Sequence, residues 1–406
     1  MGACSIQLRL RRAGISCLQA YAKCLEWKTK LASAHPPTPS QPPDITTMTS
    51  DATHLANKRA VLSAMNAIAE SSPSALKHNL AHIYHPDAEW RGSHPMNEMQ
   101  GVDAIERTVW GPLLQSFPDL ERRDTLVMGG RFQERDYVGM VGHLVGSFKR
   151  DWNGIPASDQ VIYLRYGEFH QMVDGKIIQS TVLMDVLDFI RQAGFWPMAP
   201  SLGAEGLWSG PFANDGIVLS PQDPQESAAS LALTLAMHAS LGGHDDTLHT
   251  TAATRREGLL SMPQKQYWHP KMMWYGPSGI GSTRGLEGFV DYHQMPFRIA
   301  FPKGPSLPQP PGMGQHGGSH YVRIGDGRYS ATGGWPSRHM MHQGGGWLGL
   351  PTTGRAVTMR VMDFYRADQG LIRENWVPID IIQVLLQLDV DVLARVRSQF
   401  GSHKSA

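Results

Sequence analysis

The sequence predicts an α+β protein of two tandem cone-shaped domains, each a strongly curved, mostly antiparallel sheet wrapped around about three helices. Two observations carry this prediction. The chain repeats itself once over most of its length, and each copy begins with helical spacing and continues with long alternating stretches. The 406 residues are also too many for one ordinary core, since single domains cluster near ~100–200 residues.

The composition excludes several classes of protein. Lys plus Arg number 37 and Asp plus Glu 36, so the net charge of +1 gives no general field for gripping nucleic acid. Hydrophobic residues make up 41% of the chain, too many for a disordered protein. No apolar run reaches the ~18 residues of a membrane span. We therefore expect neither nucleic-acid nor membrane partners.

The beginning of the chain differs from the rest. Its first thirty residues contain six basic side chains and a single acidic one, Glu26. A Pro-rich spacer occupies residues 35–43. The three cysteines also lie here, which excludes a disulfide framework in the rest of the chain. Residues 1–47 could be an organellar transit peptide. We favour a disordered tail, or Met48 as the true start, and expect a leader at 1–53 and a cytoplasmic protein.

The repeat becomes visible when the residue numbers of equivalent motifs are subtracted from each other. His269-Pro270 stands 184 residues after His85-Pro86, and a Pro- and Gly-rich insertion then lengthens the second copy. Beyond the insertion an offset of 195 residues holds for about forty positions. The pairs at this offset include Trp152 and Trp347, Arg165 and Arg360, Phe169 and Phe364, and Asp185 and Asp380. Agreement across strands, turn and helix indicates a duplication.

The repeat and the spacing of Pro and Gly set the domain boundaries. We assign residues 54–195 to the first domain, 196–226 to a linker in which Pro and Gly cluster, and 227–400 to the second domain. The two domains are expected to pair within one chain, with a homodimer of whole chains as an alternative.

Within the first copy, helices precede strands. Apolar spacing predicts helices at 57–70, 74–84 and 101–116, with Ser74 as an N-cap. Alternation predicts strands at 125–128, 137–148, 161–172 and 176–184, and a short helix is expected at 186–193. Asp174-Gly175 is the signal of a two-residue hairpin. Helices ahead of a long meander predict a sheet curved around an interior.

Several motifs resemble the SnoaL-like polyketide cyclase family, which has the nuclear-transport-factor-like cone fold. The first copy carries Gly142-His143, Gly154-Ile155-Pro156 and Asp174-Gly175-Lys176-Ile177 before Asp185. The second carries the stretch from Gly349 to Arg355, then Glu374-Asn375-Trp376 and Asp380. The resemblance covers roughly residues 57–195 and 228–390. It implies the fold more than the reaction, since such cones host cyclases, isomerases, hydrolases and binding proteins.

The resemblance implies a catalytic aspartate inside the cone, and Asp185 and Asp380 are the candidates. Such a base takes a proton from a carbon between carbonyls, and the enolate closes a ring without a cofactor. An apolar cavity raises the pKa of a carboxylate toward the working pH, as a general base requires. The alternative is structural, because each aspartate precedes a short helix, at 186–193 and 381–388, and can cap it.

Two histidines are further catalytic candidates. His143 matches the family's histidine, and Trp335 takes its place in the second copy. His170 precedes Asp185 by fifteen residues across the hairpin, so strand pairing could bring it to the same cavity. Tyr365 is its counterpart in the second copy, as a substrate-binding residue. A polar donor beside a base suits enolate chemistry, while a hydrogen-bonded core or surface histidine is the alternative.

Tryptophans could line a pocket for a planar polycyclic or terpenoid-like ligand. The candidates are Trp152, Trp335, Trp347 and Trp376. Core filling is the alternative, and we prefer it for Trp152 and Trp347. Histidines crowd the second copy, but in Gly-rich loops without a matching acidic motif, and no Gly-x-Gly-x-x-Gly motif opens a helix. We expect no metal, no nucleotide and no other cofactor.

These patterns predict a cofactor-independent enzyme that acts on a hydrophobic, carbonyl-containing small molecule. A cyclase or isomerase of polyketide-like or terpenoid-like compounds, with an Asp general acid/base, fits them best. Two alternatives stay open. One is a non-catalytic binding protein for an apolar metabolite, and the other is a hydrolase or epoxide-opening enzyme in which the aspartate activates water.

Overall fold

The computed structural model describes residues 50–241, 251–302 and 320–404. These residues form two six-stranded sheets with equivalent strand orders, β2-β1-β6-β5-β4-β3 and β8-β7-β12-β11-β10-β9. In each sheet one neighbouring pair is parallel, β1–β6 or β7–β12, and the other pairs are antiparallel. The predicted α+β class is confirmed, and the same arrangement of strands occurs twice.

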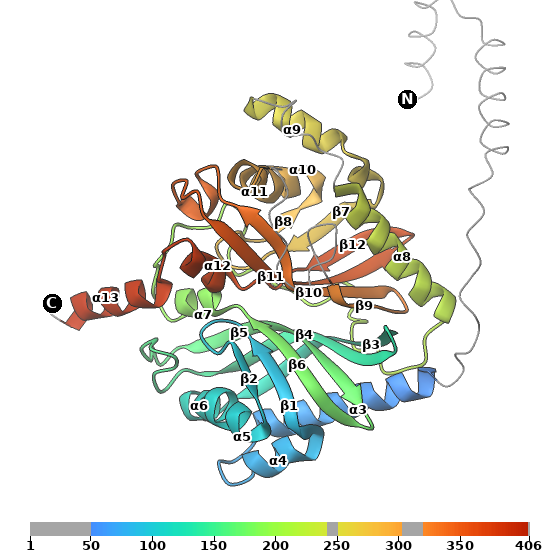
Figure 1. The fold of residues 1–406 in the computed structure, drawn as a ribbon, viewed down its shortest axis with the longest axis vertical. Helices are drawn as coiled ribbons and strands as arrows, with labels where there is room; N and C mark the ends of the chain where they lie inside the picture. The colour runs from blue at the N-terminus through green and yellow to red at the C-terminus, as the bar shows by residue number, and fades with distance from the viewer. Residues whose placement is uncertain (1–49, 242–250, 303–319, 405–406) are drawn as a thin grey trace, which may run out of the picture. The chain divides into compact units, whose positions relative to one another are not determined.

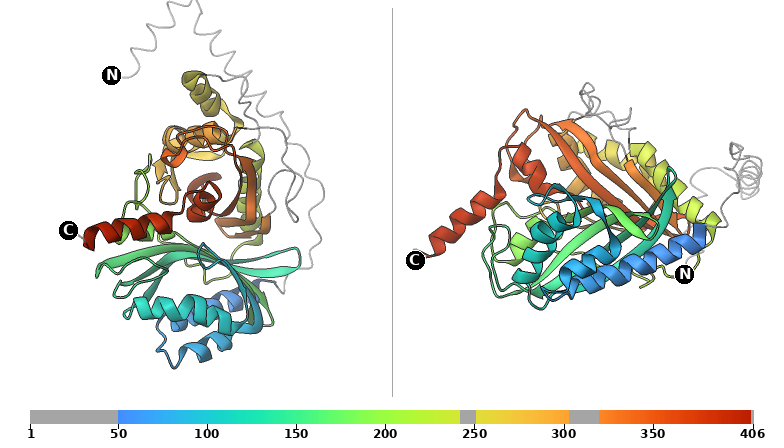
Figure 2. Two further views of the ribbon diagram at one scale, coloured as in Figure 1. Left: turned by 60° about the vertical axis from the view of Figure 1, so that its left-hand side comes forward. Right: turned by 60° about the horizontal axis from the view of Figure 1, so that its bottom comes forward.

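In the first copy, helices α3 to α6 cover one face of the sheet (Figures 1 and 2). The helices are α3 (Ser50–Ala69), α4 (Leu76–Ile83), α5 (Val102–Ile105), a π-helical turn (Glu106–Trp110), α6 (Gly111–Ser116) and α7 (Val186–Gln192). The strands are β1 (Tyr84–Gly92), β2 (Glu98–Gln100), β3 (Glu121–Phe132), β4 (Arg135–Ser147), β5 (Val161–Val173) and β6 (Lys176–Met184).

The local signals of the first copy have mixed outcomes. The hairpin at Asp174-Gly175 is confirmed, since both residues have positive φ, 49° and 75°, as a two-residue turn requires. The N-cap prediction is wrong, because the cap position of α4 is Ala75, with no side-chain cap; the Ser74 hydroxyl lies 3.1 Å from that of Ser72 instead. The leader boundary at residue 53 falls inside α3, and β1 and β2 were not predicted.

The second copy repeats this plan with longer additions. Its helices are α8 (Pro224–Ser240), α9 (Ala252–Ser261), a 3-10 turn (Pro263–Gln266), α10 (Gly285–Phe289), a π-helical turn (Val290–Gln294), α11 (Met295–Ala300), a second 3-10 turn (Trp347–Gly349), α12 (Ile381–Gln387) and α13 (Val392–Lys404). Its strands are β7 (Trp268–Tyr275), β8 (Thr283–Arg284), β9 (His320–Asp326), β10 (Tyr329–Met341), β11 (Ala356–Asp368) and β12 (Leu371–Trp376).

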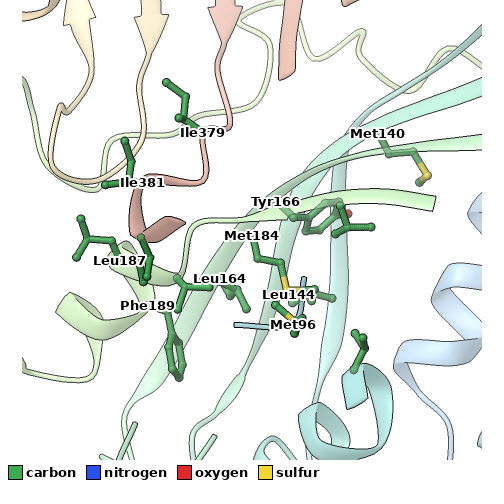
Figure 3. Close-up of a cluster of buried hydrophobic side chains, with 14 of the residues drawn as sticks. Met96, Met140, Leu144, Leu164, Tyr166, Met184, Leu187, Phe189, Ile379 and Ile381 are labelled. Carbon is green, nitrogen blue, oxygen red and sulfur yellow. The ribbon is translucent and has the colours of Figure 1, made fainter. Parts of the chain in front are cut away.

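We call the sheet face covered by the helices of its own copy the inner face, and the opposite face the outer face. On the inner face of the first sheet, Met140, Leu144 and Tyr166 belong to the main hydrophobic core, which continues through Phe189 of α7 to Ile381 of α12 (Figure 3). Alternation along each strand sends every second side chain to this core. The core therefore fixes which residues each copy can present inside.

The two outer faces pack against each other through a second hydrophobic cluster. Phe169 and Phe364, equivalent residues of the two copies, stack at its centre with ring centroids 4.9 Å apart and an interplanar angle of 11°. A Cβ atom at Gly139 would lie 2.9 Å from the Phe169 ring, so glycine is needed for this approach. Contact between equivalent residues indicates an approximate twofold relation between the copies.

Part of the segment at 196–226 lies along the two sheets. The backbone N–H of Val127 in β3 donates to Gly216 O at 2.8 Å, and the indole N–H of Trp376 in β12 donates to Ser209 O at 2.7 Å. Asp215 forms an ion pair with Arg366 of β11 at 2.6 Å. The segment is therefore bound along much of its length. Across the described ranges, no helix is both long and apolar enough to cross a membrane.

Candidate active site

The inner faces of the two sheets carry acidic residues at equivalent positions. Glu168 of β5 corresponds to Asp363 of β11 at the offset of 195 residues. Two residues further along the same strands stand His170 and Tyr365, and alternation places them on the same face as the acids. The surroundings of the two acids differ, and the comparison between them locates the candidate site.

In the first copy, Glu168 belongs to a closed ion network. Arg122 of β3 forms a very short contact with Glu168 and donates from Nε to Asp124 Oδ1 at 3.0 Å. His170 Nε2 lies 3.2 Å from Glu168 Oε1. The Tyr166 hydroxyl donates to Asp124. Arg122 and His170 thus surround the Glu168 carboxylate, and Arg122 and Tyr166 hold the Asp124 carboxylate.

The side chains of this network are buried from solvent, and their partners are other buried side chains of the first copy. Glu168 is 2% exposed and His170 0%. His170 Nδ1 lies 2.7 Å from Ser180 Oγ, which in turn lies 3.0 Å from the Tyr84 hydroxyl. Burial alone would raise the pKa of Glu168, but the charges of Arg122 and His170 outweigh it and lower that pKa to about 2. A carboxylate held this firmly as an anion is a poor general base at neutral pH.

In the second copy, Asp363 has different partners. It is half-buried and accepts hydrogen bonds from Tyr365 and Asn375. Within the described part of the chain no arginine or lysine forms an ion pair with it. Burial therefore raises the pKa of Asp363 to about 6, against the smaller effect of the two hydrogen bonds and of the Arg338 charge. This value suits a general base.

A histidine from a helix completes the group. His238 of α8 places Nε2 at 2.7 Å from the Tyr365 hydroxyl. Burial, together with the charges of His320, Arg338 and Arg323, lowers the pKa of His238 to about 3, so the ring is neutral at pH 7. Since the Tyr365 hydroxyl donates to the Asp363 carboxylate, the network assigns the donor tautomer at Nε2 to His238. The result is a donor chain from His238 through Tyr365 to Asp363.

Asp185 and Asp380, the aspartates predicted as bases, each cap a helix. Each accepts from the backbone N–H three residues further on, at 2.9 Å for Asp185 and 3.2 Å for Asp380. Each also forms an ion pair with the arginine that the repeat places beside it, Arg165 at 2.9 Å and Arg360 at 3.1 Å. These contacts match the structural alternative for both residues.

The same two carboxylates join the copies. Asp185 of the first copy accepts from the backbone N–H of Ser278 in the second copy at 2.8 Å. Asp380 of the second copy makes the equivalent contact with the first copy, accepting from the backbone N–H of His94 at 2.9 Å. Burial raises the pKa of both aspartates, against the opposing charge of their arginines. A cavity of about 10 Å³ beside Asp185 has room for about one water molecule. His170 lies elsewhere, in the ion network, so the structure does not bring it to Asp185.

Asp185→Asn is expected to lower stability and to leave proton transfer intact. Asn keeps the cap, but it removes the charge that pairs with buried Arg165, at a cost on the order of 3 kcal/mol; Asp188, 3.6 Å from Arg165, compensates only in part. Thermal unfolding measures the first effect and substrate proton exchange the second. Loss of exchange at an unchanged melting temperature would instead identify Asp185 as the base.

His143 and Trp335 lie away from both inner faces. His143 opposes Arg165 across β4 and β5, and its ring centroid lies 5.8 Å from that of Tyr163. Burial and then the charge of Arg165 lower its pKa to about 4. The Trp335 indole N–H donates to Glu98 of the first copy at 2.6 Å, and the Arg360 guanidinium lies 4.2 Å from its ring centroid. Their functional roles stay predictions.

The other three tryptophans are almost fully buried. Trp152 packs edge-on against Phe189 with ring centroids 5.1 Å apart, and Trp347 packs against Phe301 at 5.1 Å. Trp376 belongs to the cluster between the outer faces and stacks on Tyr275 at 5.3 Å. Among the predicted substrate-binding residues, Tyr365 is therefore the one that lies beside Asp363.

Sequence reasoning missed Asp363 and His238. A signal for Asp363 was present, since acidic residues occupy both equivalent positions, 168 and 363. His238 had no such signal, because the partner strand of its helix lies about 127 residues further on. Among the residues that the structure describes, no cluster of three or more His, Cys, Asp or Glu side chains could hold a metal ion.

The comparisons with known proteins agree with this fold. The family model of SnoaL-like polyketide cyclases matches residues 61–193 and 339–388. Residues 61–193 and 339–388 belong to the SnoaL-like polyketide cyclase family. The first match spans most of the first copy of this SnoaL-like protein, and the second spans β11, β12 and α12 of the second copy. The resemblance predicted from the sequence is therefore confirmed, together with the duplication.

Solved structures match about a third of this SnoaL-like chain each. A protein of Jannaschia sp. CCS1, assigned to the SnoaL-like polyketide cyclases, is 17% identical and covers 36% of this chain and 95% of its own, with a TM-score of 0.31. AclR of Streptomyces galilaeus, a candidate hydroxylase, is 19% identical and covers 36% and 98%, with a TM-score of 0.30. IdmH of Streptomyces antibioticus, a candidate polyketide cyclase, is 16% identical and covers 33% and 98%, with a TM-score of 0.28. No curated protein matches the sequence.

Proposed function

We propose that the second copy carries out cofactor-independent proton transfer on a hydrophobic carbonyl compound, as a cyclase or isomerase, with Asp363 as general base. The observation that carries this proposal is the contrast between equivalent acids. Glu168 is sealed in an ion network, whereas Asp363 is half-buried, hydrogen-bonded to Tyr365 and without an ion pair in the described residues. The family name points to the same class of chemistry.

The reaction begins with a carbon acid next to the carbonyl group of the substrate. The C–H bond breaks, the proton goes to the Asp363 carboxylate, and the electron pair moves to the carbonyl oxygen as an enolate. Once Asp363 is protonated it no longer needs the Tyr365 hydrogen bond, so this hydroxyl can donate to the enolate oxygen, with His238 behind it. The enolate carbon then attacks a second carbonyl of the same molecule, whose π bond opens to an alkoxide that takes the proton from Asp363. In an isomerase, the enolate instead takes this proton back at another position, and either route returns Asp363 to the carboxylate.

The first copy supports this site without sharing its chemistry. Its acid is held as an anion, and its outer face packs against the outer face of the second copy through Phe169 and Phe364. A base bound so firmly by Arg122 would gain little from accepting a proton. We therefore propose that the first copy acts as a scaffold for the second.

Proton exchange on a neutral aryl ketone tests the proposal. The wild-type protein is expected to accelerate deuterium incorporation into the methyl group of 2-acetylnaphthalene in D₂O, and Asp363→Asn to reduce this rate ~10²–10⁴-fold. Asp368→Asn, on the same strand, is the matched control and should leave the rate unchanged. Mass spectrometry measures the exchange, and the melting temperature reports on folding.

The pH profile adds a second readout of the same proposal. Asp363 must be ionised to act, so the rate should rise as the pH increases through about 6 and fall below it, because burial raises the pKa of this carboxyl to about 6. A wild-type rate in Asp363→Asn, or a profile without this rise, would contradict the assignment of the base. Binding of the ketone by the wild type without any exchange would favour the alternative of a binding protein.

A further inference from the structure

The second inner face carries a row of polar side chains that the proposed proton transfer does not use. Arg323 of β9 lies opposite Thr332 of β10, and Thr332 lies opposite Asp363 of β11. Residues directly opposite each other in antiparallel strands have Cβ atoms ~4.5–5.5 Å apart and share one face. The row therefore runs beside the proposed base, with Thr332 between Arg323 and Asp363 in the strand register.

Several polar atoms of this row and of the neighbouring His320 have no hydrogen-bond partner among the described residues. Thr332 is 0% exposed, and its Oγ1 has no hydrogen-bond partner there. Arg323 Nε and His320 Nδ1 are also buried and unpartnered within the same ranges. The Arg323 guanidinium lies 5.9 Å from the Phe132 ring centroid, a contact that satisfies none of its N–H groups. Buried polar groups are normally hydrogen-bonded, so unpartnered donors gathered on one face suggest a ligand acceptor.

The charges on this face favour an anionic ligand. In the ranges that the structure describes, neither Arg323 nor Arg338 forms an ion pair, and Arg338 is an exposed residue of β10. Their charges contribute to the lowered pKa values of His238 and His320, so both arginines act on the interior around Asp363. The Asp363 carboxylate lies on the same face, and the two arginines outnumber it.

The equivalent row of the first copy is apolar. Val127 lies opposite Met140, and Met140 lies opposite Glu168, so the positions of Arg323 and Thr332 hold aliphatic side chains there. Both apolar residues are 0% exposed and belong to the core. The polar row is thus a property of the second copy, and the fold does not require it.

We infer that the inner face of the second copy binds a ligand through a carboxylate group, held by Arg323, Thr332 and His320 beside Asp363. The inference rests on the proposed function, since the ligand would be the substrate of the same site or its product. A carboxylate oxygen can accept from the guanidinium and the hydroxyl together, and its negative charge matches the excess of cations. The substrate class is therefore an aromatic or other apolar carbonyl compound that also carries a carboxylate.

Two probes of similar shape test this inference, 2-naphthoate and the uncharged 2-acetylnaphthalene, with calorimetry on the full-length protein. The wild type is expected to bind 2-naphthoate at least ~10-fold more tightly than the ketone, the gain of one charge-assisted hydrogen bond. Arg323→Met should weaken 2-naphthoate binding ~10-fold or more and change ketone binding by less than ~3-fold. Thr332→Val should weaken 2-naphthoate binding ~3–10-fold.

Two further variants separate this inference from the proposed function. Arg328→Met is the matched control, since Arg328 is exposed, pairs with Glu226 at 3.3 Å and should not affect binding. Asp363→Asn removes a negative charge near the ligand, so it should strengthen 2-naphthoate binding even though it is expected to slow proton exchange ~10²–10⁴-fold. If 2-naphthoate binds as expected but Asp363→Asn still exchanges protons at the wild-type rate, the assignment of Asp363 as general base is wrong and the proposed carboxylate site is retained.

Three results would contradict the proposed carboxylate site. Equal affinity of the wild type for the two probes would overturn it, as would no detectable 2-naphthoate binding at millimolar concentration. Wild-type 2-naphthoate affinity in Arg323→Met would do the same. Near-ultraviolet circular dichroism confirms that each variant is folded, so a loss of binding can be assigned to the substituted side chain.

Discussion

Replacing Arg122 with methionine should lower the melting temperature by about 6–20 °C. The guanidinium pairs with Glu168 and Asp124 in the interior of the first copy, and its removal leaves two buried carboxylates without their cation. Breaking a buried ion pair on one side costs ~3–5 kcal/mol, and for a chain of this size each kcal/mol is worth ~2–4 °C. Thermal unfolding by circular dichroism measures the change.

The pH dependence of that loss comes from Glu168. Its pKa is about 2 in the folded protein, below the ordinary value of 4.5. Stability from this pairing is therefore present above pH ~4.5 and disappears as the pH falls through about 2. The difference between wild type and Arg122→Met should be largest at neutral pH and should shrink in acid. A constant difference across this range would show that lost packing, and not lost charge pairing, destabilises the variant.

Two substitutions serve as controls for Arg122→Met. Arg131→Met, on the same strand but with an exposed partner, should change stability by less than ~1 kcal/mol. Asp363→Asn should have the opposite effect and raise the stability of the folded protein at pH 8. Since the pKa of Asp363 is raised to about 6, its ionisation destabilises the folded protein above that pH, and a neutral amide removes this cost. A pronounced loss of stability in Asp363→Asn would contradict the assignment of a carboxylate without an ion pair.

Phe169→Ala and Phe364→Ala should each cost ~3–5 kcal/mol, because each removes one half of the stack between the outer faces. The two rings are buried, with 1% and 0% of their surface exposed, and they occupy the centre of the cluster that joins the copies. Denaturant unfolding gives the free energies. A second, separate unfolding transition in either variant would show that the copies come apart before they unfold.

The double variant distinguishes contact from independent packing. The rings touch, so the loss in the double variant should be smaller than the two single losses together by ~0.5–1.5 kcal/mol, the value of an aromatic pair beyond its burial. Phe148→Ala, a buried ring inside the first copy, is the matched control and should add to Phe364→Ala without this coupling. Strict additivity of Phe169→Ala and Phe364→Ala would mean that the stack contributes nothing of its own.

Local and repeated features of the fold could be predicted from the sequence. The turn at Asp174-Gly175 depends on two residues alone, and the strand at 176–184 was predicted with its observed bounds. The offset of 195 residues identified Phe169 and Phe364 as equivalent. It could not show that they touch, because equivalence within a repeat says nothing about which faces of the two copies pack together.

The candidate site was predicted less well, for a physical reason. Asp185 and Asp380 stand at the ends of strands, where spacing along the chain cannot tell an inward side chain from one that reaches the other copy. The neighbours that decide this, Ser278 and His94, are 93 and 286 residues away. The value of Asp363 as a base likewise depends on which described side chains surround it, Tyr365 and Asn375 in place of an arginine such as Arg122, and that is a property of three dimensions.

The segment that joins the copies has a consequence for how they can change. Two separate chains that paired through these faces would dissociate on dilution, whereas a tethered partner is present at an effective concentration near the millimolar range. Separate identical chains would also share every substitution, so an interior with Arg122 and Glu168 would force the same interior on its partner. Covalent fusion removes that constraint, and it lets one copy keep a permanent set of ion pairs while the other surrounds Asp363 with neutral hydrogen-bond donors.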